Sequence, residues 1–119
     1  MTSAITTESL QAKLDVLRFA APVWQCFRGR PLSDKVAQIA YEAWTDAAKD
    51  LYLEISDAVK TGHTVIFKSS RFLDGRPHVV RTLGWLYNGD WIRHAEEKDT
   101  IWCPAGFRLS IAETVEIEQ

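Results

Sequence analysis

Apolar residues in the first quarter of the chain recur with the period of an α-helix. At spacings of four, three, four and three they form an apolar seam of Leu10, Leu14, Leu17, Ala21 and Trp24. Thr6 or Thr7 can cap this helix through its hydroxyl. Pro22 lies inside the seam, removes a backbone donor and clashes with the preceding turn, so we predict a kink or break near Ala20–Ala21. A short separate helix over Pro22–Phe27 agrees equally well.

A second and longer helical pattern follows. Ser33 can cap it, Asp34 lies in its first turn, Lys60 suits its negative end, and Gly62 suits the left-handed conformation that follows a helix. Its apolar arc consists of Val36, Ala40, Ala43, Trp44, Ala47, Leu51, Ile55 and Val59. The many alanines in this arc allow another helix or a sheet to approach closely.

From His63 onward the period changes from 3.6 to 2, which indicates β-strands. The predicted strands are Thr64–Phe72, Pro77–Tyr87, Asp90–Glu97, Thr100–Cys103 and Phe107–Ile117, with tight turns at Asp74-Gly75 and Asn88-Gly89. We therefore predict one α+β domain, residues 1–119. Its helical half, residues 1–62, packs on an antiparallel meander of four to five strands in residues 63–119.

The Asn88-Gly89 turn also predicts which side chains share a face. A two-residue turn places Leu86 opposite Trp91 and Trp85 opposite Ile92, and these two apolar pairs point to opposite sides of the sheet. The face expected to pack on the helices contains Val65, Phe67, Val80, Leu86 and Trp91. A one-residue bulge in the middle strand would exchange the two faces.

The second, apolar face suggests a binding surface. It is centred on Trp85, Ile92 and Leu83, with Ile66 and Tyr87 beside them. The leading hypothesis is a non-enzymatic interaction module: an adaptor, a subunit of a complex or a stoichiometric inhibitor that binds another protein. A self-complementary face would give a two-fold homodimer. A curled sheet, or the first helix crossing to the far side, would explain the same pattern without a partner.

The second helix carries a row of carboxylates. They are Glu42, Asp46, Asp50, Glu54 and Asp57. Carboxylates one turn apart lie about 6 Å from each other and can imitate a run of phosphates to a basic protein groove. This supports an alternative function, a phage- or mobile-element-type inhibitor of a host defence nuclease, similar in kind to anti-CRISPR proteins. An ordinary solvated helix face explains the row more simply.

Composition and charge disfavour some classes of function. The formal charge is −2, which disfavours general nucleic-acid binding, and the five Trp suit a core or an interface. Arginines interleave with aromatic residues in the second half, but nearby acidic residues favour cross-strand ion pairs over a nucleic-acid platform. The chain has no long apolar segment and no basic-then-apolar leader, so we expect a cytoplasmic protein.

Catalytic and metal-binding signals are weak. His63, His78 and His94 lack metal-ligand spacing, and we predict no metal or cofactor. Cys26 and Cys103 read as free thiols, although a fold that brought them together could pair them. A third hypothesis is a small enzyme or ligand-binding protein with a pocket between helices and sheet. Trp24, Trp44 and Trp91 would line this pocket, with His94 or Cys103 nearby.

Overall fold

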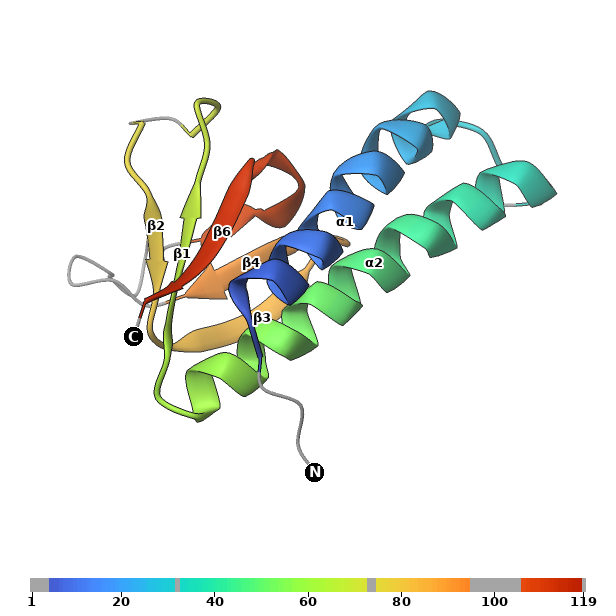
Figure 1. Ribbon diagram of the computed structural model, residues 1–119. Helices are drawn as coiled ribbons and strands as arrows, with labels where there is room; N and C mark the ends of the chain where they lie inside the picture. The colour runs from blue at the N-terminus through green and yellow to red at the C-terminus, as the bar shows by residue number, and fades with distance from the viewer. Residues whose placement is uncertain (1–4, 32, 73–74, 95–105, 119) are drawn as a thin grey trace.

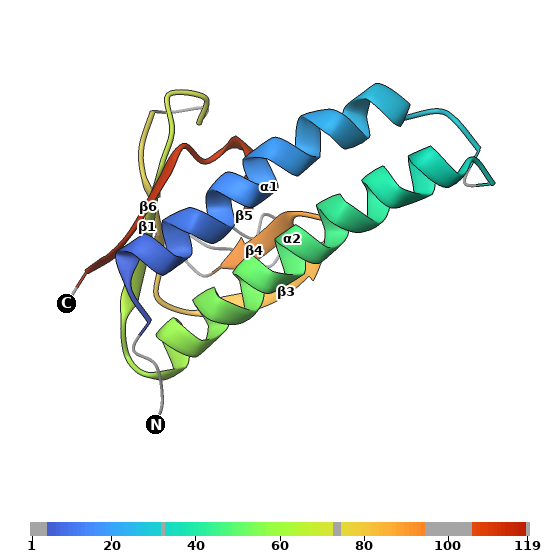
Figure 2. The same ribbon diagram turned by 45° about the vertical axis from the view of Figure 1, so that its right-hand side comes forward.

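Two helices and six strands form over the residues that the structure describes, 5–31, 33–72, 75–94 and 106–118 (Figure 1). In this computed structural model they are α1 (Thr7–Phe27), α2 (Lys35–Lys60), β1 (Thr64–Lys68), β2 (His78–Val80), β3 (Leu83–Tyr87), β4 (Trp91–His94), β5 (Gly106–Arg108) and β6 (Thr114–Glu118), with a 3₁₀ turn, η1, at Leu109–Ile111. The helices form an antiparallel hairpin whose connected end projects beyond the strands (Figures 1 and 2). The predicted α+β class is confirmed.

The first helix is continuous through Pro22, so the predicted break near Ala20–Ala21 and the alternative of a separate helix over Pro22–Phe27 are both wrong. Of the two predicted candidates, Thr6 is the cap, its hydroxyl accepting from the Ser9 N–H at 3.0 Å. Pro22 lies inside the helix and is exposed. It has no N–H to donate to the backbone carbonyl one turn earlier, but water can reach that carbonyl. The apolar seam continues on both sides of Pro22, and α1 packs on α2, so tertiary contacts stabilise the helix across the proline.

The second helix begins one residue later than predicted and ends at Lys60 as predicted. Asp34, rather than Ser33, is the cap: its carboxylate accepts from the N–H groups of Val36 and Ala37. Gly62 follows the helix with a φ of +88°. Within the described residues, neither helix has a stretch apolar enough to cross a membrane.

The strands form two small antiparallel sheets, so the predicted single meander is wrong. The strand orders are β2-β1-β6 and β3-β4-β5. The predicted strand Pro77–Tyr87 bends at Arg81-Thr82, and its two parts join different sheets. Val80 and Leu83 both pack against the core although they are three residues apart, which a regular strand of period two cannot achieve. The predicted Thr100–Cys103 strand lies outside the described residues.

The first hairpin also differs from its prediction. A two-residue turn at Asp74-Gly75 would pair Val65 with Gly84, whereas Val65 pairs with Val80. The chain leaves the sheet after β1, and Phe72 turns inward, with its ring 4.6 Å from that of His78 and 5.5 Å from that of Phe107. A tight turn would have lengthened the pairing of β1 and β2. In the observed fold the Phe72 ring is buried instead of taking part in that pairing.

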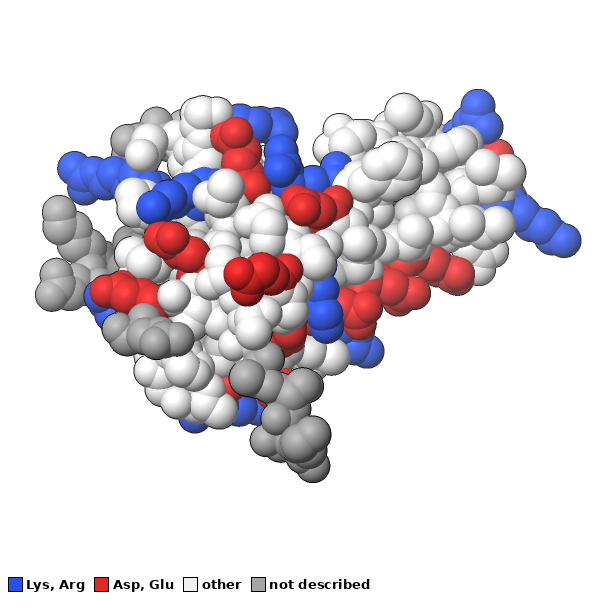
Figure 3. All heavy atoms as spheres, viewed as in Figure 1, with Lys and Arg blue, Asp and Glu red and all other residues white. Residues whose placement is uncertain are grey.

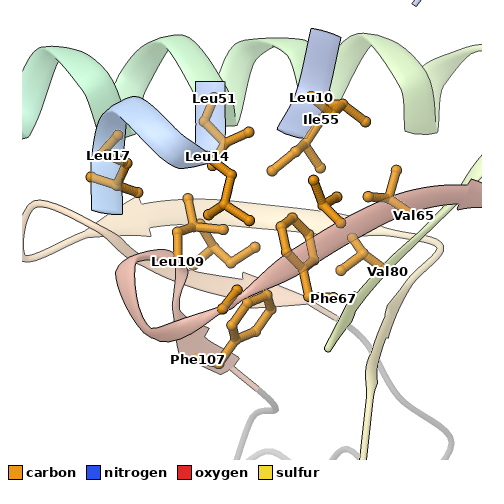
Figure 4. Close-up of a cluster of buried hydrophobic side chains, with 14 of the residues drawn as sticks. Leu10, Leu14, Leu17, Leu51, Ile55, Val65, Phe67, Val80, Phe107 and Leu109 are labelled. Carbon is orange, nitrogen blue, oxygen red and sulfur yellow. The ribbon is translucent and has the colours of Figure 1, made fainter. Parts of the chain in front are cut away.

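The core lies between the helical hairpin and the two sheets (Figure 4). The helices contribute leucines and an isoleucine from above, and the strands contribute valines and phenylalanines from below. Its largest fully buried apolar side chains are Phe67, Leu10, Leu14, Leu17, Leu51, Ile55, Ile92 and Leu109. The rings of Phe67 on β1 and Phe107 on β5 lie 5.1 Å apart, so they join the two sheets.

A polar side of α1 binds the free edge of β6. The Thr7 hydroxyl accepts from the Ile117 N–H at 3.1 Å, and the Gln11 carboxamide oxygen accepts from the Val115 N–H at 2.9 Å. The Gln11 carboxamide nitrogen donates to the Glu113 carbonyl at 3.2 Å. Helix side chains thus stand in for a neighbouring strand and cover an edge that could otherwise pair with another chain.

We expect Gln11→Ala to lower the free energy of unfolding by about 1–3 kcal/mol, because it leaves the Val115 N–H of β6 without its partner, whereas the Glu113 carbonyl keeps its hydrogen bond from Arg18. Urea denaturation measures this difference. Gln38→Ala is the matched control, since Gln38 is an exposed helical glutamine whose side chain donates to Glu42 and bonds to no other described residue. Equal losses in the two variants would contradict this role of Gln11.

Glu113 joins the start of β6 to the segment after β1. Its Oε1 accepts from the Ser70 hydroxyl and the Ser70 N–H, both at 2.6 Å, and from the Ser69 hydroxyl at 3.1 Å. The hydrogen bonds from Ser70, followed by that from Ser69, lower the pKa of the Glu113 carboxyl below its ordinary value of 4.5. The carboxylate form therefore stabilises the folded protein.

We expect Glu113→Gln to reduce stability at pH 7 and to bring the variant closer to the wild type in acid. The carboxylate contributes stability at pH values above 4.5, and the contribution disappears as the pH falls through the lowered folded pKa. Unfolding midpoints measured from pH 7 to pH 3 test this. Glu118→Gln, at the end of β6, is the control for removing one carboxylate and should reduce stability at pH 7 by less than Glu113→Gln. A constant Glu113→Gln deficit over the whole range would refute the linkage.

Candidate functional site

The β3–β4 loop decides which side chains reach the surface. The prediction placed Leu86 opposite Trp91, but Tyr87 pairs with Trp91 and Leu86 pairs with Ile92. Asn88 and Gly89 adopt positive φ angles of 48° and 83°, as the turn prediction requires, but the loop holds a third residue, Asp90. The added residue shifts the register by one and exchanges the two faces of β4.

Asp90 stays in the loop because its side chain is buried and fully engaged. One carboxylate oxygen accepts from Arg108 at 2.9 Å, and the other accepts from the Ser110 N–H at 3.1 Å. The Asp90 carbonyl accepts from the Leu109 N–H at 2.8 Å. A two-residue turn would instead pair Asp90 with Tyr87 and would take this carboxylate away from these donors, so the hydrogen bonds favour the longer loop.

Three aromatic side chains consequently lie on the outer side of the β3-β4-β5 sheet. Trp85 and Tyr87 on β3 are 57% and 58% exposed, and Trp91 on β4 is 37% exposed. Trp85 and Tyr87 share a side because they are two residues apart, and Trp91 stands opposite Tyr87 in the register. We call Trp85, Tyr87 and Trp91 the aromatic face.

Neighbouring residues restrict two of these rings. The Arg93 guanidinium lies 5.3 Å from the Trp85 ring centroid, a cation–π contact. Gly106 on β5 leaves room for Trp91, since a Cβ at that position would lie 2.9 Å from Nε1 and Cζ2 of the indole. Rings held in place in this way lose little conformational entropy on binding.

The residues predicted as one interface lie in three places. Trp85 and Tyr87 belong to the aromatic face, whereas Ile92 is fully buried and Leu83 packs against the core. Ile66 is half-buried in the other sheet, where it pairs with Val79 and Glu116. Trp91, which the sequence assigned to the core-facing side, is exposed because of the register shift.

A cleft of about 440 Å³ lies between the projecting end of the hairpin and the β3–β4 loop. Its aromatic wall is a cluster in which Trp24 stacks on Trp44 at 5.9 Å and Tyr41 meets Trp24 edge-on at 5.1 Å. The polar lining residues are Gln25, Arg28, Asn88, Asp90, Arg108 and Ser110. Asp90 and Arg108 bind each other, so much of the polar lining is internally satisfied.

The pocket predicted between helices and sheet is therefore present in part. Trp24 and Trp44 line the cleft, but Trp91 does not, because it faces the other side of its sheet. His94 does not line it either: it is buried between the two sheets, its Nε2 3.0 Å from Nδ1 of His78 and its ring against Phe107. Cys26 is an exposed free thiol, and Cys103 lies outside the described residues.

The two histidines meet although they stand 16 residues apart on different strands, a proximity that sequence spacing does not reveal. Both rings pack on Phe107, which His78 stacks at 4.3 Å. Among the described residues, no group of three His, Cys, Asp or Glu side chains is arranged to hold a metal ion.

Some carboxylates of the predicted acidic row on α2 have side-chain partners within the protein, and others do not. Glu54 turns toward α1, where it accepts from the Ser9 hydroxyl and pairs with Lys13 at 3.8 Å. Glu42 accepts from Gln38 at 3.3 Å. The remaining members, Asp46, Asp50 and Asp57, form no ion pair with another described residue. Acidic side chains gather along one edge of the projecting hairpin in Figure 3.

The chain matches no protein-family model, no curated protein and no solved structure at a significant level. Functional inference therefore depends on the surfaces of the fold itself.

We expect Gly89→Ala to disrupt the cleft, because a Cβ there would lie 2.2 Å from Cη2 of Trp44, on a backbone with φ of +83°. Gly62→Ala is the matched control, with φ of +88° and open space around the Cβ. The control should lose about 1–2 kcal/mol through backbone strain alone, and Gly89→Ala should lose clearly more. Urea denaturation and near-ultraviolet circular dichroism measure both effects. Equal losses would show that Trp44 does not pack tightly on the loop.

Proposed function

We propose that the protein is a non-enzymatic interaction module that binds another protein through its aromatic face. The observation that carries the proposal is the exposure of Trp85, Tyr87 and Trp91 together on one side of a sheet. Tryptophan and tyrosine are enriched among the side chains that contribute most to protein binding, because they bury a large area at a small entropy cost. The proposal covers an adaptor, a subunit of a complex or a stoichiometric inhibitor.

The charge around the aromatic face favours a protein partner over a nucleic acid. Stacking platforms for single strands combine aromatic rings with cations that are available to phosphates. Here Arg108 is bound by the buried Asp90, and the Arg93 guanidinium lies over Trp85. With a net charge of −2, the chain offers little overall attraction to a polyanion.

A cytoplasmic location is part of this proposal. The exposed thiol of Cys26 is free in the structure. Free exposed thiols are typical of reducing compartments, where disulfides are rare.

The acidic row supports a second candidate function. Asp46, Asp50 and Asp57 lie on one side of α2, and their charges are available because they form no ion pair with a described residue. A row of this kind could occupy a phosphate-binding groove of a basic protein. In that case the protein would act as a phage- or mobile-element-type inhibitor of a host defence nuclease.

Affinity capture from the native host with three proteins tests the two candidates: the wild type, Trp85→Ala/Tyr87→Ala, and Asp46→Lys/Asp50→Lys. We expect the aromatic double variant to lose a partner that the wild type retains. With the purified partner, calorimetry should show binding at least about 30-fold weaker, since hot-spot truncations cost 2 kcal/mol or more. Both replaced aromatic side chains are more than half exposed, so the fold should be retained.

Val36→Ala is the matched control, an exposed apolar residue at the start of α2, outside the aromatic face and ten residues before Asp46. Loss of the partner only in the Asp46→Lys/Asp50→Lys variant would replace the leading proposal with the second candidate. Unchanged binding by the aromatic double variant, or retention on single-stranded DNA that falls steeply with salt, would refute binding of a protein through the aromatic face.

A further inference from the structure

Helix α1 carries a second apolar seam that the sequence analysis did not identify. It consists of Ala12, Val16, Phe19, Val23 and Cys26. Their spacings of four, three, four and three repeat those of the buried seam, and at 100° per residue the two seams lie on opposite sides of the helix. This outer seam contains no charged residue.

The outer seam is exposed in the folded chain. Phe19 is 77% exposed, Val16 60% and Val23 39%, and Ala12 and Cys26 are also exposed. The body of the protein lies on the other side of α1, where Leu14 and Leu17 are fully buried. Figure 3 shows uncharged surface over the projecting part of the hairpin. An uncharged stripe of this length on a helix exterior is typical of helix pairing.

We propose that two copies of this chain associate through the outer seam, with their α1 helices antiparallel about a two-fold axis. This surface is separate from the aromatic face, so the inference does not depend on the proposed function. The spacing assigns Val16 and Val23 to heptad position a, and Ala12, Phe19 and Cys26 to position d. Antiparallel helices place each a residue against a d residue of the opposite helix.

The seam is complementary to itself in this arrangement. When Val16 lies against Phe19 of the second copy, the same register places Ala12 against Val23, and the two-fold axis repeats both layers. A large side chain therefore meets a smaller one in each of these layers, as close packing requires.

The charges beside the seam also favour a second copy. In this register Asp15 lies near Pro22 of the other helix, and Lys13 lies near Ala20, so no like charges are brought together. The acidic row belongs to α2 and remains outside the helix pair. Two heptads form a short interface, so we expect association at roughly 1–100 µM rather than a permanent dimer.

Sedimentation velocity over this concentration range tests the association. The wild type should shift from monomer toward dimer, and Phe19→Lys should remain monomeric at every concentration. Phe19 is exposed, so thermal unfolding should show that the variant is folded. Leu53→Lys is the matched control, an exposed leucine on α2 away from the seam, and it should dimerise like the wild type. A wild type that is always monomeric, or a Phe19→Lys variant that still dimerises, would overturn the proposal.

Mild oxidation tests the orientation in a Cys103→Ser background. Antiparallel pairing keeps the two Cys26 thiols roughly 25 Å apart along the helices, at 1.5 Å per residue, so Cys26 should form no intermolecular disulfide. Ala12→Cys/Val23→Cys, made with Cys26→Ser, should cross-link because these positions face each other. Cross-linking through Cys26 would indicate parallel helices and overturn the antiparallel arrangement.

Discussion

The buried carboxylate of Asp90 is the constraint on which the second sheet depends. It binds Arg108 and the Ser110 N–H, and it thereby keeps Asp90 in the β3–β4 loop. The loop length sets the register, and the register turns Ile92 into the core and Trp91 to the surface. The alternative register would give up these charge-assisted hydrogen bonds, so they favour the observed one. The aromatic face and one wall of the cleft thus both depend on the hydrogen bonds of the Asp90 carboxylate.

Helix α1 organises the rest of the molecule by using three of its sides. One side buries Leu10, Leu14 and Leu17 in the core. A second side presents Thr7 and Gln11 to the edge of β6, where their side chains replace a neighbouring strand. The third side carries the outer seam. A helix hydrophobic on two opposite sides is expected where a chain forms its own core and also offers a surface for association.

The strands were harder to predict than the helices because their apolar residues do not keep a strict period of two. Val80, Leu83 and Leu86 are successively three residues apart, and all three face the interior. A bend at Arg81-Thr82 and an irregularity between Leu83 and Leu86 make this possible. The bend and the irregularity each change which residues alternate between the two faces of the sheet. A face assignment that counts residues from a turn is therefore wrong past either point. Trp85 and Tyr87 were recognised as surface candidates, whereas Trp91, the outer seam of α1 and the histidine pair were not.

The sequence by itself determined the helical character of the first half, a threonine cap at Thr6 or Thr7, the helix end at Lys60 and the positive φ angles at Asn88-Gly89, but not the continuity of α1 through Pro22. These features depend on residues within a few positions of one another, and local hydrogen bonding and backbone sterics decide them. Only the tertiary structure decided the division into two sheets, the register of β4 and the covering of the β6 edge. These depend on contacts between residues far apart in the chain, such as Asp90 with Arg108 or Gln11 with Val115, which no local pattern records.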